Sequence, residues 1–242
     1  MSGILLDHIA IATERIADAP AVLVGRLGGA PAYGGVSSMY RFWQWRFTGG
    51  GRIEILEPAS ADGFLRRFLR TRGPGVHHVT FRVPSLSETC ARARALGYEI
   101  VGYDDSDPDW KEAFLHPRQA LGIVVQFAET ISGGADGTRS TPPAGPPDPP
   151  PAVTIIGLRL RARSPERADR QWGQVLAGEC TARGGELIYR WPGSPMRLAV
   201  EIDPTADEGP LAIEYESEGR EARPADRDPA LGTVFIRRKI SG

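Results

Sequence analysis

The sequence has little cysteine, almost no net charge and no long apolar run, and each shortage excludes a class of protein. Two cysteines, Cys90 and Cys180, in 242 residues do not form a disulfide framework, so we expect a reducing compartment. The 29 basic and 30 acidic residues give a formal net charge of -1, which provides no electrostatic reason to expect nucleic acid or an anionic membrane as a partner. No segment resembles a signal peptide or a membrane span. We therefore expect a cytoplasmic protein.

One segment lacks aliphatic residues larger than alanine. Residues 132–151 contain seven prolines, so this stretch can neither pack a core nor form a helix. The sequence therefore predicts three parts: a bi-modular domain over 1–131, a Pro/Gly-rich linker over 132–152 and a third module over 153–242.

A repeat is the most informative feature of the chain. A strand-like segment around His8 recurs 70 residues later around His78, and a polar-centred strand around Glu54 recurs 72 residues later around Gln126. Two duplicated modules would bring these two imidazoles, one carboxylate and one amide to equivalent places. Such a set suits a borderline divalent cation such as Zn, Fe, Mn, Co or Ni. We therefore predict one divalent ion bound by all four residues.

Each copy reads as a strand, a helix and further strands, the order βαβββ. The first copy has a strand over 5–12, a helix over 16–27, and strands over 38–48 and 52–57. The second has a strand over 77–83, a helix over 85–96 that begins with the capping box of Ser85 and Glu88, and strands over 100–104, 112–116 and 123–127. After the linker come a strand over 154–163, a helix from 164 to about 176, and strands near 186–191, 197–202 and 211–215. The predicted fold is α+β: paired βαβββ modules form a cup-shaped, barrel-like mixed sheet, and a third βαβββ module follows.

The third module lacks the histidine. Gly157 stands where His8 stands in the first copy, and Glu214 aligns with Gln126. A single carboxylate without an imidazole is a poor site for a transition metal. The third module is therefore expected to be a scaffold, a lid over the cup or an oligomer contact.

A single module would leave one sheet face half-covered, and such a face needs a partner. We therefore predict a homodimer about a two-fold axis, with the strands around Leu187–Trp191 and Arg197–Ile202 in its interface. In the alternative, this module is a lid on its own chain and the protein is a monomer.

One strand is rich in aromatic residues. Strand alternation puts Trp43, Trp45 and Phe47 on one face, which is more typical of a core. The other face carries Tyr40, Phe42, Gln44 and Arg46. If that face lines the cup, the pocket is aromatic with a polar end and suits a ring-bearing or extended organic acid.

Three further residues have structural and functional interpretations. His77 is taken as structural, because alternation points it away from the face of His78. His116 is expected to order the turn before Pro117. Arg118 is either a solvated charge or a group that holds an anionic part of a substrate.

Several motifs together carry a family resemblance. They are Asp-His8-Ile, His-His78-Val, Ile-Glu54-Ile-Leu-Glu-Pro, Gly73-Pro-Gly-Val-His-His, and Phe114-Leu-His-Pro-Arg before Gly-Ile-Val-Val-Gln126. As a set they resemble the vicinal oxygen chelate superfamily of glyoxalases, bleomycin resistance proteins and extradiol dioxygenases. Within this superfamily, the motif residues most resemble those of methylmalonyl-CoA epimerases. The resemblance implies a cup around a divalent metal that a small-molecule substrate chelates through two adjacent oxygens.

The chain departs from those epimerases at two places. The glutamate and glutamine at positions 54 and 126 are exchanged, and the expected catalytic glutamate is absent from the segment around Ala32 and Tyr33. Methylmalonyl-CoA is therefore expected to be a poor substrate. Candidate bases are Glu54, Tyr33 and Tyr40, besides a metal-bound hydroxide.

The predicted function is that of a metal-dependent isomerase or epimerase, acting through a stabilised enolate on a carbonyl compound that could be a CoA thioester. Two alternatives remain open. One is an Fe(II)-dependent, ring-cleaving oxygenase, and the other is a non-enzymatic small-molecule binder.

Overall fold

The computed structural model describes residues 3–130, 141–217 and 226–238. Positions 132–140 of the predicted linker lie outside the described residues. The chain divides into two compact units. The first comprises Met1–His8, His78–Gly134 and Gly157–Leu211, and the second comprises Ile9–His77, Ala135–Ile156 and Ala212–Gly242. Each unit therefore combines segments from before and after the linker, and the domain boundaries stay a prediction.

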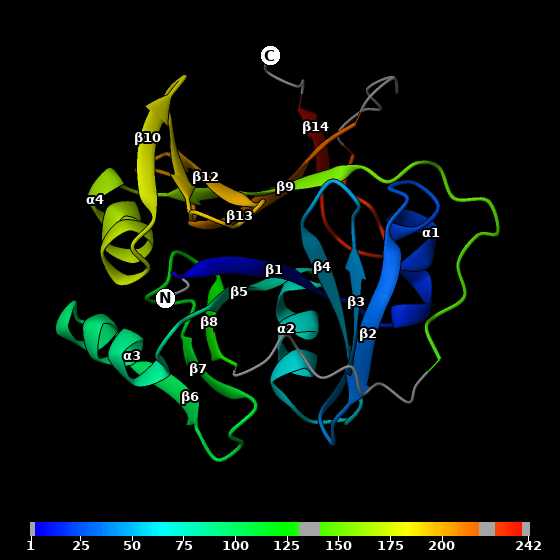
Figure 1. Cartoon of the computed structure of the whole chain (residues 1–242), viewed down its shortest axis with the longest axis horizontal. Coiled ribbons are helices and arrows are strands. Elements are labelled where there is room, and N and C mark those ends of the chain that lie inside the picture. Colours follow the sequence, from blue (N-terminus) through cyan, green and yellow to red (C-terminus); the bar gives the residue numbers. More distant parts are fainter. Residues whose placement is uncertain (1–2, 131–140, 218–225, 239–242) are drawn as a thin grey trace. The chain divides into compact units, whose positions relative to one another are not determined.

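The first module contains four strands. Its elements are β1 (Leu5–Ala12), the 3₁₀ turn η1 (Ile16–Asp18), α1 (Pro20–Leu23), β2 (Ala30–Val36), β3 (Tyr40–Arg46) and β4 (Arg52–Pro58). Strands β2, β3 and β4 run side by side (Figure 1). The helix predicted over 16–27 is shorter, because Pro20 lacks an amide hydrogen and occupies the first position of α1. Strand β2 was not predicted from the sequence.

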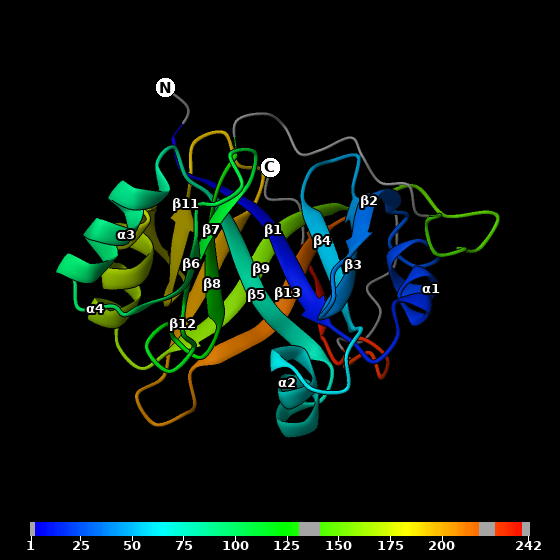
Figure 2. The ribbon, with the colours of Figure 1, turned by 90° about the horizontal axis from the view of Figure 1, so that it is seen from below.

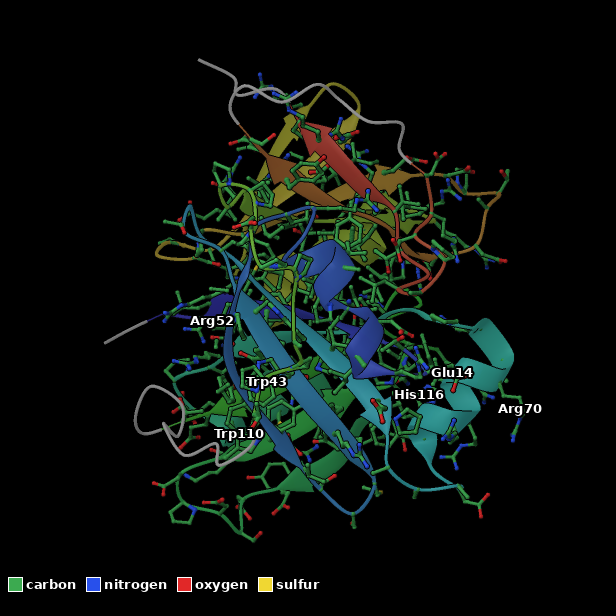
Figure 3. All side chains as sticks on the ribbon, turned by 90° about the vertical axis from the view of Figure 1, so that its right-hand side faces the viewer. Glu14, Trp43, Arg52, Arg70, Trp110 and His116 are labelled. Carbon is green, nitrogen blue, oxygen red and sulfur yellow. The ribbon has the colours of Figure 1, made fainter. Side chains whose placement is uncertain are left out.

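Helix α2 (Phe64–Arg72) follows the first module. It is amphipathic and was not predicted from the sequence. Leu65 and Leu69 lie four residues apart on one face and are buried with Ala10, Ala12 and Leu56 of the sheet. Arg70 projects away from the helix (Figure 3). The helix therefore covers part of the sheet face that carries Ala10 and Ala12.

The second module has the predicted order. Its elements are β5 (Gly75–Arg82), α3 (Leu86–Ala95), β6 (Ile100–Asp104), β7 (Lys111–Leu115) and β8 (Val124–Glu129). The Ser85 hydroxyl accepts a hydrogen bond from the Glu88 amide at 3.2 Å, so the predicted N-cap is confirmed. Gly97 follows the helix with a φ of 85°, a conformation that favours glycine.

The third module also has the order βαβββ. Its elements are β9 (Thr154–Ala162), α4 (Pro165–Ala168), which continues into the π-helical turn η2 (Asp169–Val175), β10 (Glu179–Arg183), β11 (Glu186–Arg190) and β12 (Arg197–Ile202). Helices α3 and α4 lie next to each other (Figure 2), and Arg92 Nε donates to the Val175 carbonyl at 2.6 Å. Two more strands, β13 (Gly209–Glu216) and β14 (Phe235–Arg238), follow.

The strands form two open mixed sheets. Their orders are β2-β3-β4-β1-β5-β8-β7-β6 and β10-β11-β12-β9-β13-β14. The pair β9/β12 is parallel like β1/β4, and β13/β14 is parallel like β5/β8. The second sheet thus repeats the first six strands of the first sheet. The α+β class and the paired βαβββ modules are confirmed.

This order corrects one alignment. Glu214 lies on β13, which takes the place of β5 in the repeat, and not that of β8, the strand of Gln126. The segment 186–191 was predicted to be the first of three strands after the helix, but β10 precedes it. With β10 included, β12 is the last strand of the third module.

Strands β11 and β12 bury most of their apolar side chains within one chain. Tyr189, Leu198 and Val200 are buried, and so is Trp191. Leu187 and Ile202 are half-buried. The homodimer stays a prediction.

The helices of the described residues are short, and α3 has 10 residues. Within the described ranges, no helix combines the length and the apolar character needed to cross a membrane. Both cysteines are free thiols, with Cys90 buried and Cys180 exposed.

An ion pair between a buried arginine and a half-buried glutamate joins two strands of the third module. Arg159 on β9 donates both guanidinium nitrogens to the carboxylate of Glu186 on β11, and Arg159 Nη2 lies 2.9 Å from Glu186 Oε2. These hydrogen bonds lower the pKa of the Glu186 carboxyl, and the charges of Arg159 and Arg197 act in the same direction. The pair therefore stabilises the fold only while Glu186 is ionised.

We expect Glu186→Gln to lower the free energy of unfolding at pH 7 by about 1–2 kcal/mol, because Arg159 keeps its buried charge and loses its counter-ion. The folded pKa of Glu186 lies below its unfolded value, so this stabilisation is present above the unfolded pKa and is lost as pH falls through the folded pKa. Urea unfolding of wild type and variant between pH 7 and pH 3 measures it. The difference in unfolding free energy between wild type and Glu186→Gln should shrink below about pH 4. As the control, Glu179→Gln on the exposed β10 should change the free energy of unfolding by less than about 0.5 kcal/mol.

Candidate metal centre

His8 is held on both sides of its ring. It lies on β1 with 2% of its surface exposed. Its Nε2 is 2.9 Å from the Thr80 hydroxyl, and its Nδ1 is 2.8 Å from Asp7 Oδ2. The other Asp7 oxygen lies 3.0 Å from Arg82 Nε. The orientation of the imidazole is therefore fixed by two polar partners.

Gln126 is connected to His8 through Thr80. Thr80 on β5 is the register partner of Gln126 on β8. The Thr80 hydroxyl donates to Gln126 Oε1 at 2.5 Å, and Gln126 Nε2 donates to Glu112 Oε2 at 2.7 Å. All of these side chains belong to the first compact unit.

His78 shares the face of Thr80. It precedes Thr80 by two residues on β5, so alternation points both side chains the same way. Its ring lies 5.8 Å from that of His8 at an interplanar angle of 71°. The structure therefore brings together the two histidines that the repeat predicted.

Glu54 lies on β4, which pairs with β1. Its register partner is Ala10, two residues after His8 on the same strand. Glu54 is 7% exposed, and its carboxylate accepts a hydrogen bond from Gln44 Nε2 at 2.9 Å. Gln44, predicted to bind substrate, is thus a partner of this carboxylate.

The donor set fits a divalent cation. His8, His78 and Gln126 all belong to the first compact unit, whereas Glu54 belongs to the second. Two imidazoles and one carboxylate suit Zn, Fe(II), Co, Ni or Mn, and an amide oxygen such as that of Gln126 is a suitable additional ligand. The four-residue ligand set stays a prediction.

The aromatic residues of the predicted pocket form a cluster with α2. Tyr40 and Phe42 are half-buried and pack against the core together with Phe64 and Phe68. The Tyr33 ring lies 5.8 Å from Phe42, and the Tyr40 ring lies 5.9 Å from Phe64. Tyr40 is four residues from Gln44 along β3, about 13 Å of extended chain. Tyr40 therefore lies in the aromatic wall of the predicted pocket, four residues along β3 from Gln44, the register partner of Glu54.

His77 is a core residue, as strand alternation predicts. It is buried, and its ring lies 5.6 Å from Phe64 and 4.9 Å from Phe68 of α2. Burial lowers the pKa of His77 to about 4, and the charge of Arg72 adds to the effect. His77 is therefore neutral at neutral pH.

The remaining predicted residues lie at the surface. Arg46 is exposed at the end of β3, and Arg118 is exposed in the turn after β7. His116 Nδ1 accepts a hydrogen bond from the Arg118 amide at 3.2 Å, so His116 orders this turn as predicted. Substrate binding by Arg46 or Arg118 stays a prediction.

Three polar partners of the predicted ligands were missed. Asp7 is adjacent to His8, and Thr80 lies two residues from His78, so both had a local signal in the sequence. Glu112 had none, because only the pairing of β7 with β8 brings it to Gln126.

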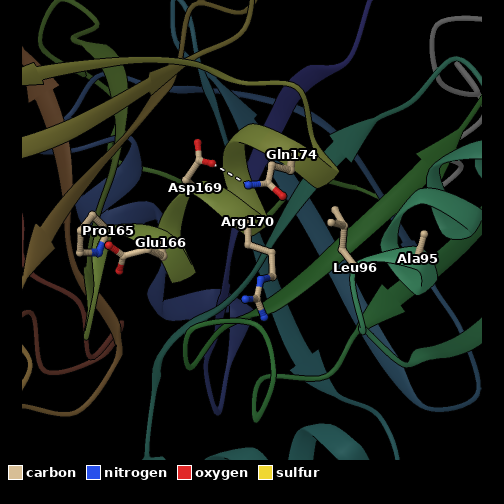
Figure 4. A pocket seen from close by; sticks show the side chains of 7 residues that line it. All are labelled: Ala95, Leu96, Pro165, Glu166, Asp169, Arg170 and Gln174. Carbon is tan, nitrogen blue, oxygen red and sulfur yellow. Dashed lines mark hydrogen bonds between the residues drawn. The ribbon is translucent and has the colours of Figure 1, made fainter.

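A groove lies elsewhere in the first unit, between the end of α3 and α4 (Figure 4). Leu96, Glu166 and Arg170 are among its lining residues. Gln174 donates to Asp169 across part of it at 2.8 Å. None of the predicted metal ligands lines this groove.

Comparison with known proteins defines the family. Residues 7–114 match the model of the Glyoxalase/Bleomycin resistance protein/Dioxygenase superfamily. The chain is 32% identical over 130 residues to the uncharacterized protein YqjC of Bacillus subtilis, covering 51% of this chain and 91% of that protein. The chain belongs to this superfamily, as its motifs predicted.

Two of the solved structures that are similar to the chain are an epimerase and a synthase. One is methylmalonyl-CoA epimerase from Mycobacterium tuberculosis, with 24% identity, a TM-score of 0.49, and coverage of 55% of this chain and 92% of that chain. The other is a triple mutant of 4-hydroxymandelate synthase from Streptomyces coelicolor, with 13% identity, a TM-score of 0.61, and coverage of 90% of this chain and 72% of that chain. The second likeness shows that the fold extends over both sheets of this chain.

Proposed function

We propose that the protein is a divalent-metal-dependent isomerase or epimerase that acts on a small carbonyl compound, such as an acyl-CoA-like thioester. The observation that carries this proposal is the pair of imidazoles of His8 and His78, whose rings lie 5.8 Å apart within the first compact unit. Glu54 is proposed as the carboxylate ligand. Gln126 joins them through its hydrogen bond with Thr80. A site of two neutral imidazoles and one carboxylate leaves a net positive charge on a divalent ion.

A bound ion would act as a Lewis acid and make the proton beside the substrate carbonyl more acidic. The chain supplies the orientation of the ligands: Asp7 holds His8 through Nδ1, which leaves Nε2 as the ligand atom, and Gln44 holds Glu54. Glu54 is the carboxylate proposed to move the proton, and Tyr33 and Tyr40 remain candidates.

The aromatic cluster supports a substrate with an apolar part. Tyr40 and Phe42 lie on the same strand face as Gln44, whose register partner is Glu54. Rings on this face contact the apolar part, while two adjacent substrate oxygens face the metal ligands. A ring-bearing organic acid satisfies both requirements.

Two other functions have specific support. The two-histidine, one-carboxylate set is also the donor set of Fe(II)-dependent oxygenases. A wall of aromatic rings would equally serve a protein that only binds its ligand.

We expect exchange of the substrate proton with solvent. The protein is loaded in turn with Co²⁺, Mn²⁺, Zn²⁺ or Fe²⁺ and incubated in deuterated water with 2-oxo acids, 2-hydroxy ketones and acyl-CoA thioesters. Deuterium beside the carbonyl, measured by mass spectrometry, is the expected result. Glu54→Ala should lower the exchange rate about a hundredfold or more, because a positioned base contributes at least that factor.

Glu14→Ala, which removes an exposed carboxylate, should leave the exchange unchanged. Oxygen consumption with Fe²⁺ and no deuterium uptake would replace the isomerase with the oxygenase. Ligand binding without either reaction would favour the binder. Methylmalonyl-CoA is included as the thioester for which slow exchange is expected.

We further infer a reducing, cytoplasmic setting from the two free cysteines. The homodimer stays a proposal about assembly, with the strands of residues 187–191 and 197–202 as its expected contact.

A further inference from the structure

The hydrogen bonds around Gln126 have a defined direction. A carboxylate only accepts hydrogen bonds, so the 2.7 Å contact with Glu112 Oε2 must come from the Nε2 side of the amide. The amide oxygen is thereby turned to the opposite side, where the Thr80 hydroxyl donates to it at 2.5 Å. Glu112 therefore determines which end of the amide faces the strand that carries His78.

Glu112 is itself held in place. Trp110 Nε1 donates to the same oxygen, Oε2, at 2.9 Å. On the sheet, Glu112 is the register partner of Ala128 and thus a diagonal neighbour of Gln126 on the same face. Two donors on one carboxylate oxygen, both from the same unit, restrict its position.

We infer that Glu112 is a positioning residue that presents the oxygen, and not the nitrogen, of Gln126 to the metal centre. The inference rests on the metal site proposed above. An amide is symmetric in shape, and without a carboxylate beside it, it could present either end. A nitrogen end facing the ion would offer two hydrogens and no lone pair for coordination.

The first module carries the same kind of pair with the roles reversed. There the amide of Gln44 donates to the carboxylate of Glu54 at 2.9 Å, and the carboxylate is the predicted ligand. In the second module the amide of Gln126 is the predicted ligand, and the carboxylate of Glu112 is its partner. Each module therefore has one acid and one amide, and the pairing explains why an amide at position 126 is compatible with a carboxylate at 112.

The test uses the full chain and Co²⁺ as the probe. Glu112→Leu removes the acceptor, and we expect a loss of Co²⁺ affinity of about 10–100-fold together with a changed visible absorption spectrum of the bound Co²⁺. Glu112→Gln can still accept through its amide oxygen and should restore the affinity to within about threefold and the spectrum to that of wild type. Glu99→Leu, at an exposed position, is the control for the loss of a carboxylate.

Two comparisons decide whether Glu112 acts through Gln126. In a Gln126→Ala background, Glu112→Leu should have no further effect on affinity, because the amide it orients is gone. In the metal-free protein, the side-chain amide NMR signals of Gln126 should shift in Glu112→Leu and stay near their wild-type positions in Glu112→Gln.

Additive losses in the double variant, or unchanged affinity, spectrum and NMR signals in Glu112→Leu, would overturn the inference and leave the metal site standing. A wild-type protein that binds no Co²⁺ would overturn the proposed metal site and the inference with it.

Discussion

We expect His8→Ala and His78→Ala each to lose the divalent ion that we propose the wild-type protein binds. Each variant removes one of two imidazoles that lie 5.8 Å apart, centroid to centroid, on neighbouring strands. The loss should exceed the roughly 100-fold that removal of an outer partner of a ligand costs, because a ligand itself is removed. Gln126→Ala should cost less than either histidine, because an amide oxygen is the weaker donor for these metals. Titration with Co²⁺ and elemental analysis of the purified proteins measure the effect.

The matched control is His116→Ala. His116 is exposed, and it orders a turn away from the two histidines. This variant should bind one ion per chain like the wild type. Equal metal content in all four proteins (wild type, His8→Ala, His78→Ala and His116→Ala) would show that the imidazoles are not ligands.

Phe81→Ala will lower the free energy of unfolding by about 4 kcal/mol, the usual cost of emptying a buried phenylalanine site. Phe81 on β5 is fully buried. Its ring lies 4.7 Å from Trp191 at an angle of 64° and 6.0 Å from Trp172 of η2. The side chain therefore connects the second module to the third through aromatic packing. Urea unfolding monitored by tryptophan fluorescence and by circular dichroism measures the loss.

Tyr103→Ala is the control for this measurement. Tyr103 is an aromatic residue with 42% of its surface exposed, so its removal should cost less than about 1 kcal/mol. A loss below about 1.5 kcal/mol for Phe81→Ala would contradict the shared core. The same experiment tests the predicted domain boundaries, because separately folding domains before and after the linker would unfold in two transitions.

The repeat was enough to predict the histidines and the class of fold. Strand alternation and equal spacing are local properties, so they place His8 and His78 at equivalent positions in two modules without knowledge of their neighbours. The same reasoning separated His77 from His78. The turn at His116 was predicted separately, because a histidine before a proline can order the local backbone.

The errors came from elements with weak local signals. The missed strand β2 contains Pro31 and a pair of glycines, which are poor strand formers, and β10 is an exposed edge strand with little apolar character. Omission of β10 shifted the alignment of the third module and moved Glu214 to the wrong position. Helix α2 had a readable amphipathic pattern in Phe64, Leu65, Phe68 and Leu69, but it lies outside the βαβββ repeat that guided the analysis.

The sequence by itself determined which residue types recur and on which strand face they lie, because the period of a strand is a property of the chain. Only the tertiary structure decided their partners. Thr80 reaches His8 across 72 residues, and Glu112 meets Gln126 through the register of two strands. These contacts depend on which strands pair and in what register, which are set by the packing of the whole sheet and not by any local pattern.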